Sequence, residues 1–268
     1  MGKAAIAGRA SEKCTQRFRR GISGGKDVLE YAYRCCKANK GAPGVDGQEF
    51  AYIEAYGEER WLGELADTLR RKTYRAEAVR RVWIPKEGNK NKLRPLGIPC
   101  ILDRVVMTAA VVVLEPIFEV DMPAEQHGYR PNLSAHTAVR AVHRLINTGH
   151  TQVIEADLSS YFDSIAHAEL LKSVARRVSD RHLLHLIKMW LEAPVEEDDG
   201  KGGKKRTTPN KDSGRGVPQG APIAYLGTRP SKKSMRRIIA AMRETIDRRV
   251  LWLEAEEMVE RVNRKLVG

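Results

Sequence analysis

Several residues of this sequence are of types that act on phosphate groups. Asp157 follows the short predicted strand 152–156, so its carboxylate is placed at a strand end. Lys86 and Arg94 flank a polar, glycine-containing stretch, and an arginine guanidinium can bind two phosphate oxygens at once. Gly220 ends a Pro-Gln-Gly sequence, and a glycine lets the backbone approach a ligand closely. Each residue on its own also has an ordinary explanation: a strand-end cap, a solvated charge or a turn.

Lys86 and Arg94 are positioned by a predicted β-hairpin. Residues 79–85 and 93–98 are rich in apolar and β-branched side chains, which favours strands. The residues between them, 86–92, are polar and include a glycine, which is typical of a turn. We therefore predict a hairpin whose tip is basic.

Helices account for most of the remaining pattern. Apolar residues at the helical period predict helices over 26–38, 63–72, 105–114, 135–146, 168–178 and 180–191, and further amphipathic stretches over 235–246 and 258–266. The nearly all-apolar helix 105–114 is expected to be buried and to end before Pro116. Ser134 is the expected N-cap of the helix after it. Residues 194–215, acidic and then basic and glycine-rich, predict a flexible loop or an exposed hairpin. Strands combined with these helices predict a layered α/β or α+β core.

The net charge of the 268-residue chain is +13, from 47 Lys and Arg against 34 Asp and Glu. An excess of this size favours nucleic acid as the partner, because each neutralised phosphate releases condensed counterions. An acidic membrane surface is the weaker alternative, and no apolar run approaches the ~18 residues that suggest a membrane span. The four cysteines lack zinc-ligand spacing and no secretion signal is seen. We therefore expect a reducing cytoplasm.

Residues 153–165, Val-Ile-Glu-Ala-Asp-Leu-Ser-Ser-Tyr-Phe-Asp-Ser-Ile, resemble the first catalytic motif of reverse transcriptases. Other blocks resemble, in the same order, motifs of group II intron-encoded reverse transcriptase/maturases: Gly44-Val45-Asp46-Gly47, Ile84-Pro85-Lys86, Arg94-Pro95-Leu96-Gly97-Ile98-Pro99, Asp103-Arg104, Leu114-Glu115-Pro116-Ile117-Phe118, Gly128-Tyr129-Arg130-Pro131 and Pro218-Gln219-Gly220. The blocks cover roughly residues 38–223, and their shared order is more specific than any one of them.

The resemblance implies an α+β right hand, with fingers and a partial palm followed by a short helical thumb or maturase stub. It divides the chain into a basic N-terminal arm and helix (1–37), fingers (38–150), a truncated palm (151–227) and the start of the thumb or maturase region (228–268).

The resemblance also implies nucleotide-binding roles. Lys86 and Arg94 match fingers residues that clamp the triphosphate. Phe162 matches the residue that packs under the sugar and discriminates against a 2′-hydroxyl. Gln219 and Gly220 match the loop that borders the incoming nucleotide.

The metal chemistry implied by the resemblance needs two Mg²⁺ ions ~3.5–4 Å apart. Asp157 matches the catalytic, metal-binding carboxylate, and the Leu158 carbonyl matches a further metal ligand. The family completes this site with a Tyr-Ala-Asp-Asp hairpin after the Pro-Gln-Gly motif, and this sequence lacks that hairpin. Its adjacent aspartate pair, Asp198 and Asp199, precedes the motif in a charged stretch. With one carboxylate in place of three, we expect the metal site to be incomplete.

We therefore interpret the chain as an internally truncated group II intron reverse transcriptase/maturase. Such proteins are RNA-directed DNA polymerases that also assist intron splicing and mobility. The implied partners are group II intron RNA, an RNA template with its DNA primer, and deoxynucleoside triphosphates, in a cytoplasmic ribonucleoprotein without a membrane. We expect impaired polymerisation. Two alternatives stay open: a non-catalytic RNA-binding splicing helper, and a degenerate copy without function.

Overall fold

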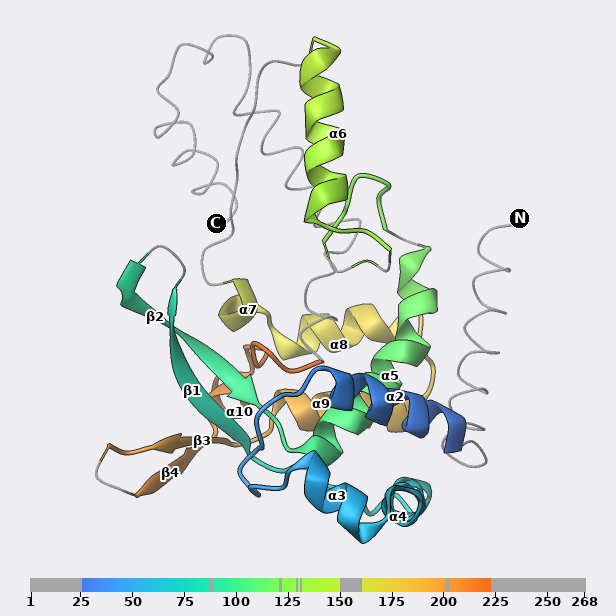
Figure 1. The fold of residues 1–268 in the computed structure, drawn as a ribbon, viewed down its shortest axis with the longest axis vertical. Coiled ribbons are helices and arrows are strands. Elements are labelled where there is room, and N and C mark those ends of the chain that lie inside the picture. Colours follow the sequence, from blue (N-terminus) through green and yellow to red (C-terminus); the bar gives the residue numbers. More distant parts are fainter. Residues whose placement is uncertain are drawn as a thin grey trace. The chain divides into compact units, whose positions relative to one another are not determined.

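The computed structural model of the chain describes residues 26–86, 89–120, 122–128, 130, 132–149, 161–200 and 203–222. These residues fall into two compact units, one made of 26–120 and 162–222 and the other of 122–149 and Tyr161 (Figure 1). The predicted arm 1–25, the strand 152–156 and the amphipathic stretches after residue 228 lie outside the described residues. The predicted domain boundaries stay a prediction.

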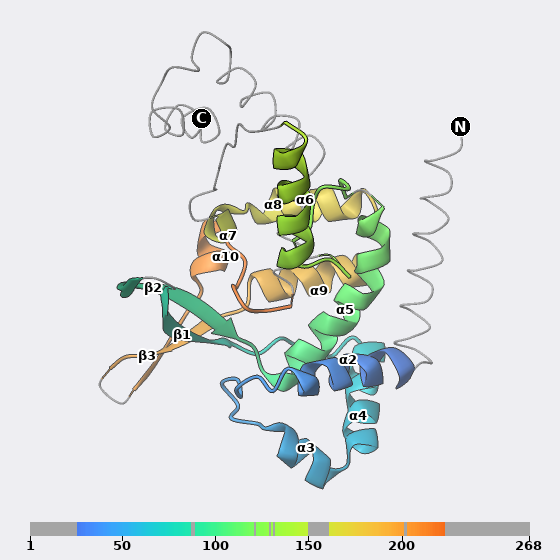
Figure 2. The same ribbon diagram turned by 45° about the horizontal axis from the view of Figure 1, so that its top comes forward.

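The core of the first unit is built on helix α5 (Ile101–Glu119), whose residues are apolar on nearly every side. Helix α2 (Lys26–Ala38) packs against it and has the predicted bounds (Figures 1 and 2). Leu29, Ala32 and Tyr33 are buried on one face of α2, at the spacing that places side chains together on a helix. The apolar periodicity of α2 is therefore explained by its contact with α5.

Helix α5 does not end before Pro116, as the sequence predicted. It continues to Glu119, with Pro116 inside its last turn. A proline here removes one backbone donor and disturbs only the end of the helix. Ile117, the next residue, is buried in the core. Burial of this side chain favours the extra turn and outweighs the local signal from the proline.

Helices α3 (Phe50–Tyr56) and α4 (Glu58–Arg70) meet at Gly57. Gly57 has a φ of +105°, and its N–H donates to two carbonyls in the last turn of α3. The sequence did not predict α3, and it placed the start of α4 at Gly63, which was wrong. Trp61 and Leu62 are buried with the rest of the apolar face of α4, so the helix starts before them.

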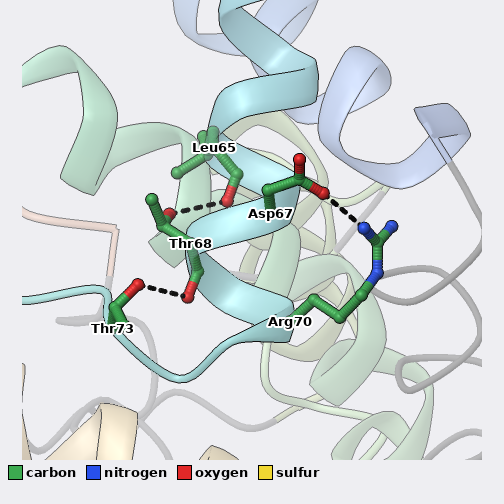
Figure 3. A network of polar contacts seen from close by, with 5 residues as sticks. All are labelled: Leu65, Asp67, Thr68, Arg70 and Thr73. Carbon is green, nitrogen blue, oxygen red and sulfur yellow. Dashed lines mark hydrogen bonds and ion pairs between the residues drawn. The ribbon is translucent and has the colours of Figure 1, made fainter.

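The end of α4 is held by two threonine hydroxyls and an ion pair (Figure 3). Thr68 Oγ1 donates to the Leu65 carbonyl at 2.8 Å, and Thr73 Oγ1 donates to the Thr68 carbonyl at 3.3 Å. Asp67 and Arg70 form an ion pair across one turn. Helix α4 ends at Arg70, two residues before the predicted end.

A four-stranded sheet flanks the helices, in the order β2-β1-β3-β4. The predicted hairpin is confirmed as β1 (Val79–Lys86) and β2 (Asn89–Ile98), with Ile84 opposite Arg94 and Val82 opposite Leu96. Both strands are longer than predicted, because several residues of the expected tip join the ladder.

The second hairpin of the sheet is β3 (Val195–Asp198) and β4 (Lys204–Thr207), so of the two predictions for 194–215 the exposed hairpin is confirmed. Strand β3 pairs in parallel with β1, and Arg81 and Glu197 form an ion pair of 2.8 Å between these strands. Glu196 pairs with Lys204 and Arg206, both at 3.1 Å. The acidic residues Glu196 and Glu197 of this hairpin are therefore neutralised by basic residues on neighbouring strands.

Helix α8 (His167–Ala175) and helix α9 (Arg181–Leu191) follow the predicted pattern. Asp180 is the N-cap of α9 and accepts hydrogen bonds from the amides of His182 and Leu183, at 2.8 and 3.1 Å. Two short helices, α7 (Tyr161–Ser164) and α10 (Pro209–Ser213), lie on either side of this pair in the sequence. Helix α7 contributes to the site described below.

The second unit contains helix α6 (Ala135–Asn147), and its predicted cap is confirmed. The Ser134 hydroxyl accepts from the Thr137 amide, and the Thr137 hydroxyl accepts from the Ser134 amide. The apolar face of α6 is exposed at Val139, Val142 and Leu145. The helix is thus amphipathic by sequence without burying its apolar face in the part of the chain that the structure describes.

A buried hydrogen-bonded group joins three parts of the first unit. The Tyr74 hydroxyl, after α4, donates to Asp103 Oδ1 in α5, and it accepts from Trp190 Nε1 in α9 at 2.9 Å. The Glu77 amide donates to Asp103 Oδ2 at 3.1 Å. Burial raises the pKa of Asp103 to about 6, although the hydrogen bonds from Tyr74 and Glu77 favour the carboxylate. Asp103, part of one motif block, therefore has a structural role.

We predict that Asp103 makes the stability of the first unit depend on pH. Its pKa is about 6 in the fold and 3.8 ordinarily, so the folded state binds the proton more tightly. This contribution is complete below about pH 4 and is lost as the pH rises through 6. Between these values the stability of the wild type should fall, relative to Asp103→Asn, by on the order of 2–3 kcal/mol.

Urea unfolding at pH 4.5 and at pH 7.5 measures this difference. The control is Asp67→Asn, an exposed carboxylate paired with Arg70 on the helix surface, which should change stability by less than about 1 kcal/mol at both pH values. A pH dependence that is the same in wild type and Asp103→Asn contradicts the prediction.

Candidate functional site

The Pro218–Gly220 turn docks on the free edge of β2. The Gly97 amide donates to the Gln219 carbonyl at 2.7 Å. A Cβ on Gly97 would lie 3.3 Å from that oxygen, 3.3 Å from Pro218 Cβ and 2.9 Å from Val79 Cγ1. Only a glycine leaves room for this contact without a shift of its neighbours. The structure thus brings the Pro-Gln-Gly motif against the Arg-Pro-Leu-Gly-Ile-Pro motif.

Gly220 is constrained in two ways. Its φ is +90°, a conformation that side chains with a Cβ adopt only with strain. A Cβ would also lie 2.4 Å from Leu96 Cδ1 and 3.2 Å from the Gly97 carbonyl oxygen. Gly220 therefore approaches strand β2 closely. The role that the sequence predicts for it beside a nucleotide stays a prediction.

The residues just before this turn run along the start of α7 and α8. The Val217 amide donates to the Phe162 carbonyl at 2.9 Å, and the Gly216 amide donates to the Ile165 carbonyl at 2.9 Å. The buried His167 side chain donates from Nε2 to the Gly216 carbonyl at 2.8 Å. Phe162 is half-buried. Its carbonyl is bonded to the Val217 amide, two residues before Gln219, so the backbone of Phe162 is tied to the segment that leads into the turn.

Arg94 lies on β2, the strand against which the turn docks. Side chains alternate between the faces of a strand, so Arg94 and Leu96 share one face, and Leu96 is the residue that Gly220 approaches. Arg94 is exposed and three residues before Gly97, about 10 Å along the strand. Lys86 is the last residue of β1 and pairs with Asn89; its side chain is not described.

The described carboxylates do not assemble a two-metal site. Asp157 and Leu158 lie outside the described residues. Asp198 Oδ1 accepts from the Gly200 amide at 3.0 Å, and Asp199 Oδ1 accepts from the Gly203 amide at 2.8 Å, so this pair caps the β3–β4 turn. Within the described residues no group of three or more His, Cys, Asp or Glu could hold a metal ion.

Another pair of motif blocks meets at the start of α5. A Cβ on Gly44 would lie 2.6 Å from Cys100 Cα, so the loop before α3 passes very close to this helix end. Arg104 Nη2 donates to the Ala42 carbonyl at 2.8 Å, and its guanidinium carbon lies 5.9 Å from the centre of the Phe50 ring. These residues support the fold beside the site.

His167 and Gly97 belong to the site although the sequence did not predict a role for either. A glycine inside a strand pattern indicates a close backbone approach, so Gly97 carried a usable signal. His167 carried none, because histidines are intermediate in burial and a single one does not indicate a buried partner. Its partner, the Gly216 carbonyl, is far away in the sequence.

Residues 84–229 match the reverse transcriptase (RNA-dependent DNA polymerase) family over more than half of the chain. The chain belongs to the reverse transcriptase family. The matched region includes Arg94, Asp157, Phe162, Gln219 and Gly220. Their individual roles stay predictions.

Three relatives specify the kind of reverse transcriptase. Protein YkfC of Escherichia coli (strain K12) is 39% identical over 204 residues, which are 74% of this chain and 50% of YkfC. The group II intron-encoded protein LtrA of Lactococcus lactis subsp. cremoris is 32% identical over 172 residues, 64% of this chain and 28% of LtrA. Nuclear intron maturase 2, mitochondrial, of Arabidopsis thaliana is 31% identical over 106 residues, 40% of this chain and 14% of the maturase.

These similarities confirm the predicted membership of the group II intron reverse transcriptase/maturases, and with it the α+β fold of the fingers and palm region. The chain spans half or less of the length of each relative. None of the helices that the structure describes is long and apolar enough to cross a membrane.

We predict that Gly220→Ala loosens the docking of the turn on β2. The positive φ and the contacts with Leu96 and Gly97 should cost about 1–2 kcal/mol. The matched control is Gly63→Ala in α4, where a Cβ meets nothing within 4 Å and helix propensity should add up to about 1 kcal/mol of stability. Urea unfolding measures both variants.

Hydrogen exchange of the Gly97 amide provides a local measurement of the same effect. This amide is protected by its hydrogen bond to the Gln219 carbonyl, so its exchange rate should rise in Gly220→Ala and stay the same in Gly63→Ala. If both alanine variants have the same stability and the same Gly97 exchange rate, the docked turn does not require a glycine.

Proposed function

We propose that this chain binds RNA as a group II intron reverse transcriptase/maturase, through its fingers and its basic surface. The proposed partners are structured intron RNA, a template with its primer, and deoxynucleoside triphosphates, within a cytoplasmic ribonucleoprotein. The observation that carries the proposal is the docking of the Pro-Gln-Gly turn on β2, with Gln219 joined to Gly97 and Arg94 exposed on the strand. The net charge of +13 supports a polyanionic partner.

The proposed nucleotide contacts follow from this arrangement. Arg94 presents a guanidinium to solvent from the face of β2 that Gly220 approaches, where it can bind phosphate oxygens with two hydrogen bonds. Gln219 and Gly220 lie against the same strand, and the glycine at position 220 places no side chain between the turn and a nucleotide. Phe162 is held by the Val217 amide and, as the resemblance implies, packs under the sugar.

We further propose that the chain by itself is impaired in polymerisation. Reverse transcriptases use Mg²⁺ held by carboxylates, and Asp157 is the residue of this chain that matches such a ligand. Asp198 and Asp199 are already engaged by backbone amides of the β3–β4 turn. This observation favours a second candidate function, a splicing helper that binds RNA without synthesising DNA. The third possibility is a degenerate copy, which should bind RNA without structural preference or not at all.

We predict that the full chain does not extend a DNA primer on an RNA template in the presence of Mg²⁺. The reason is that one matching carboxylate leaves two divalent cations with strong mutual repulsion. A primer-extension assay with radiolabelled nucleotide measures this. Robust incorporation that disappears in Asp157→Ala but persists in Asp199→Asn would refute the prediction, because Asp199 accepts a hydrogen bond from a backbone amide of the β3–β4 turn.

We also predict that the chain binds structured RNA with a steep salt dependence. The logarithm of the affinity should fall with the logarithm of the salt concentration, with a slope of roughly −0.7 to −0.9 per contacted phosphate. Filter binding or fluorescence anisotropy over a salt series measures this slope.

The controls separate RNA binding from nucleotide binding. Replacement of Lys86 and Arg94 by alanine should weaken RNA binding less than removal of residues 1–25, because their proposed ligand is a nucleotide. A flat salt dependence would contradict binding through phosphates and would favour the degenerate copy.

A further inference from the structure

Helix α6 has an apolar face that the described part of the chain leaves uncovered. Four large side chains form it, with exposed fractions between 44% and 66%: Val139, Val142, Leu145 and Ile146. We name these four residues the α6 face. Their spacing of three and four positions places them on one side of the helix. Single exposed apolar residues are ordinary, but a contiguous stripe of them marks a contact surface.

The loop before α6 contacts the helix on a different side. His127 Nδ1 lies 2.9 Å from Thr137 Oγ1. By the helical period, Thr137 lies about 200° around the helix from Val139 and about 180° from Ile146. This contact therefore leaves the α6 face open.

The size of the α6 face argues against a second copy of the chain as its partner. A helix of 13 residues is about 20 Å long and about 10 Å wide, so one side covers roughly 200 Å². A stable interface between two proteins buries about 800 Å² on each partner. A segment of the same chain is already tethered, and the tether gives it a high effective concentration. The small area therefore favours an intramolecular partner.

The sequence outside the described residues contains one stretch with a matching length. Residues 1–25 have no sustained apolar periodicity. The predicted strand 152–156 alternates its side chains, so either of its faces offers one large apolar residue. The amphipathic stretch 258–266 would be about 14 Å long as a helix, whereas 235–246 would be about 18 Å long, close to the length of α6.

The apolar residues of 235–246 repeat the spacing of those in α6. In both, they recur at steps of three, one, three and four positions: Ala135, Ala138, Val139, Val142 and Ile146 in the helix, and Met235, Ile238, Ile239, Met242 and Ile246 in the stretch. Two stripes of equal length and spacing can pack with the ridges of one in the grooves of the other. The basic residues Arg140 and Arg144 lie on the other side of α6 and stay at the surface.

We propose that residues 235–246 form a helix whose apolar side docks on the α6 face of the same chain. Each helix alone is near the length at which helices are marginal in water, so burial of the two stripes stabilises both. This inference goes beyond the proposed function and does not rest on RNA binding.

The test is hydrogen exchange on the full chain, with one aspartate placed in each stripe. Ile239→Asp should speed exchange of the α6 amides, and Val142→Asp should speed exchange of the amides of 235–246. The expected factor is about 10- to 100-fold, which corresponds to lost burial of one large aliphatic side chain. The amides of α2 and α5, in the first unit, should keep their rates, which shows that the variants still fold.

The matched controls place the same residue on the opposite sides of the two helices. Arg140→Asp should leave the exchange of 235–246 unchanged, and Arg237→Asp should leave that of α6 unchanged. Val259→Asp, in the other amphipathic stretch, should also leave the exchange of α6 unchanged.

Cross-linking gives a second measurement that does not depend on stability. Val142→Cys combined with Ile239→Cys or with Met242→Cys should form a disulfide under mild oxidation, because such a bond needs Cα atoms within about 7 Å. Peptide mapping by mass spectrometry should place the bond within one chain. Arg140→Cys with the same partners should not form it.

Three outcomes overturn the inference. The first is unchanged α6 exchange in Ile239→Asp together with no cross-link from Val142→Cys. The second is faster α6 exchange in Val259→Asp and not in Ile239→Asp, which assigns the face to the other stretch. The third is a disulfide between two chains, which assigns it to a second copy. A failure of RNA binding, with exchange and cross-links as expected, contradicts the proposed function and leaves this inference standing.

Discussion

The hydrogen bond from the Gly97 amide to the Gln219 carbonyl is the contact on which the site depends. It joins the edge of the β1–β2 hairpin to a turn that is far away in the sequence. Glycines at 97 and 220 permit it, because a Cβ at either position would collide with its surroundings. The contact is made by backbone atoms, so it fixes the distance between the two motifs regardless of which side chains later bind a ligand.

The aspartates of this chain show how environment assigns a role to one residue type. Asp103 is buried, bonded to Tyr74 and to the Glu77 amide, and holds helices together. Asp180 caps a helix, and Asp199 caps a hairpin turn. Each of these carboxylates is satisfied by protein donors. A carboxylate that binds a metal needs oxygen atoms that are not occupied by protein donors. The sequence predicts such a carboxylate at a strand end, at Asp157.

The two faces of the β1–β2 hairpin differ because a strand exposes alternate side chains on opposite faces. One face presents Arg94 toward the region of the docked turn, and the other presents Trp83 and Leu93. The free edge between these faces is blunted by Pro95 and by the bond from Gly97.

The sequence by itself determined the elements whose signals are local: helix α2 with its bounds, the Ser134 cap, the β1–β2 hairpin and the reverse transcriptase motifs in their order. Tertiary structure decided what depends on distant partners. Helix α5 continues past Pro116 because Ile117 finds a buried site, and strands β3 and β4 of the stretch 194–215 join the sheet because β3 pairs with β1. The contact between the two glycine-containing motifs was also not predictable from the sequence, because no local pattern indicates which two distant backbone segments will meet. Local propensity is a property of neighbouring residues, whereas burial and strand pairing are properties of the folded chain.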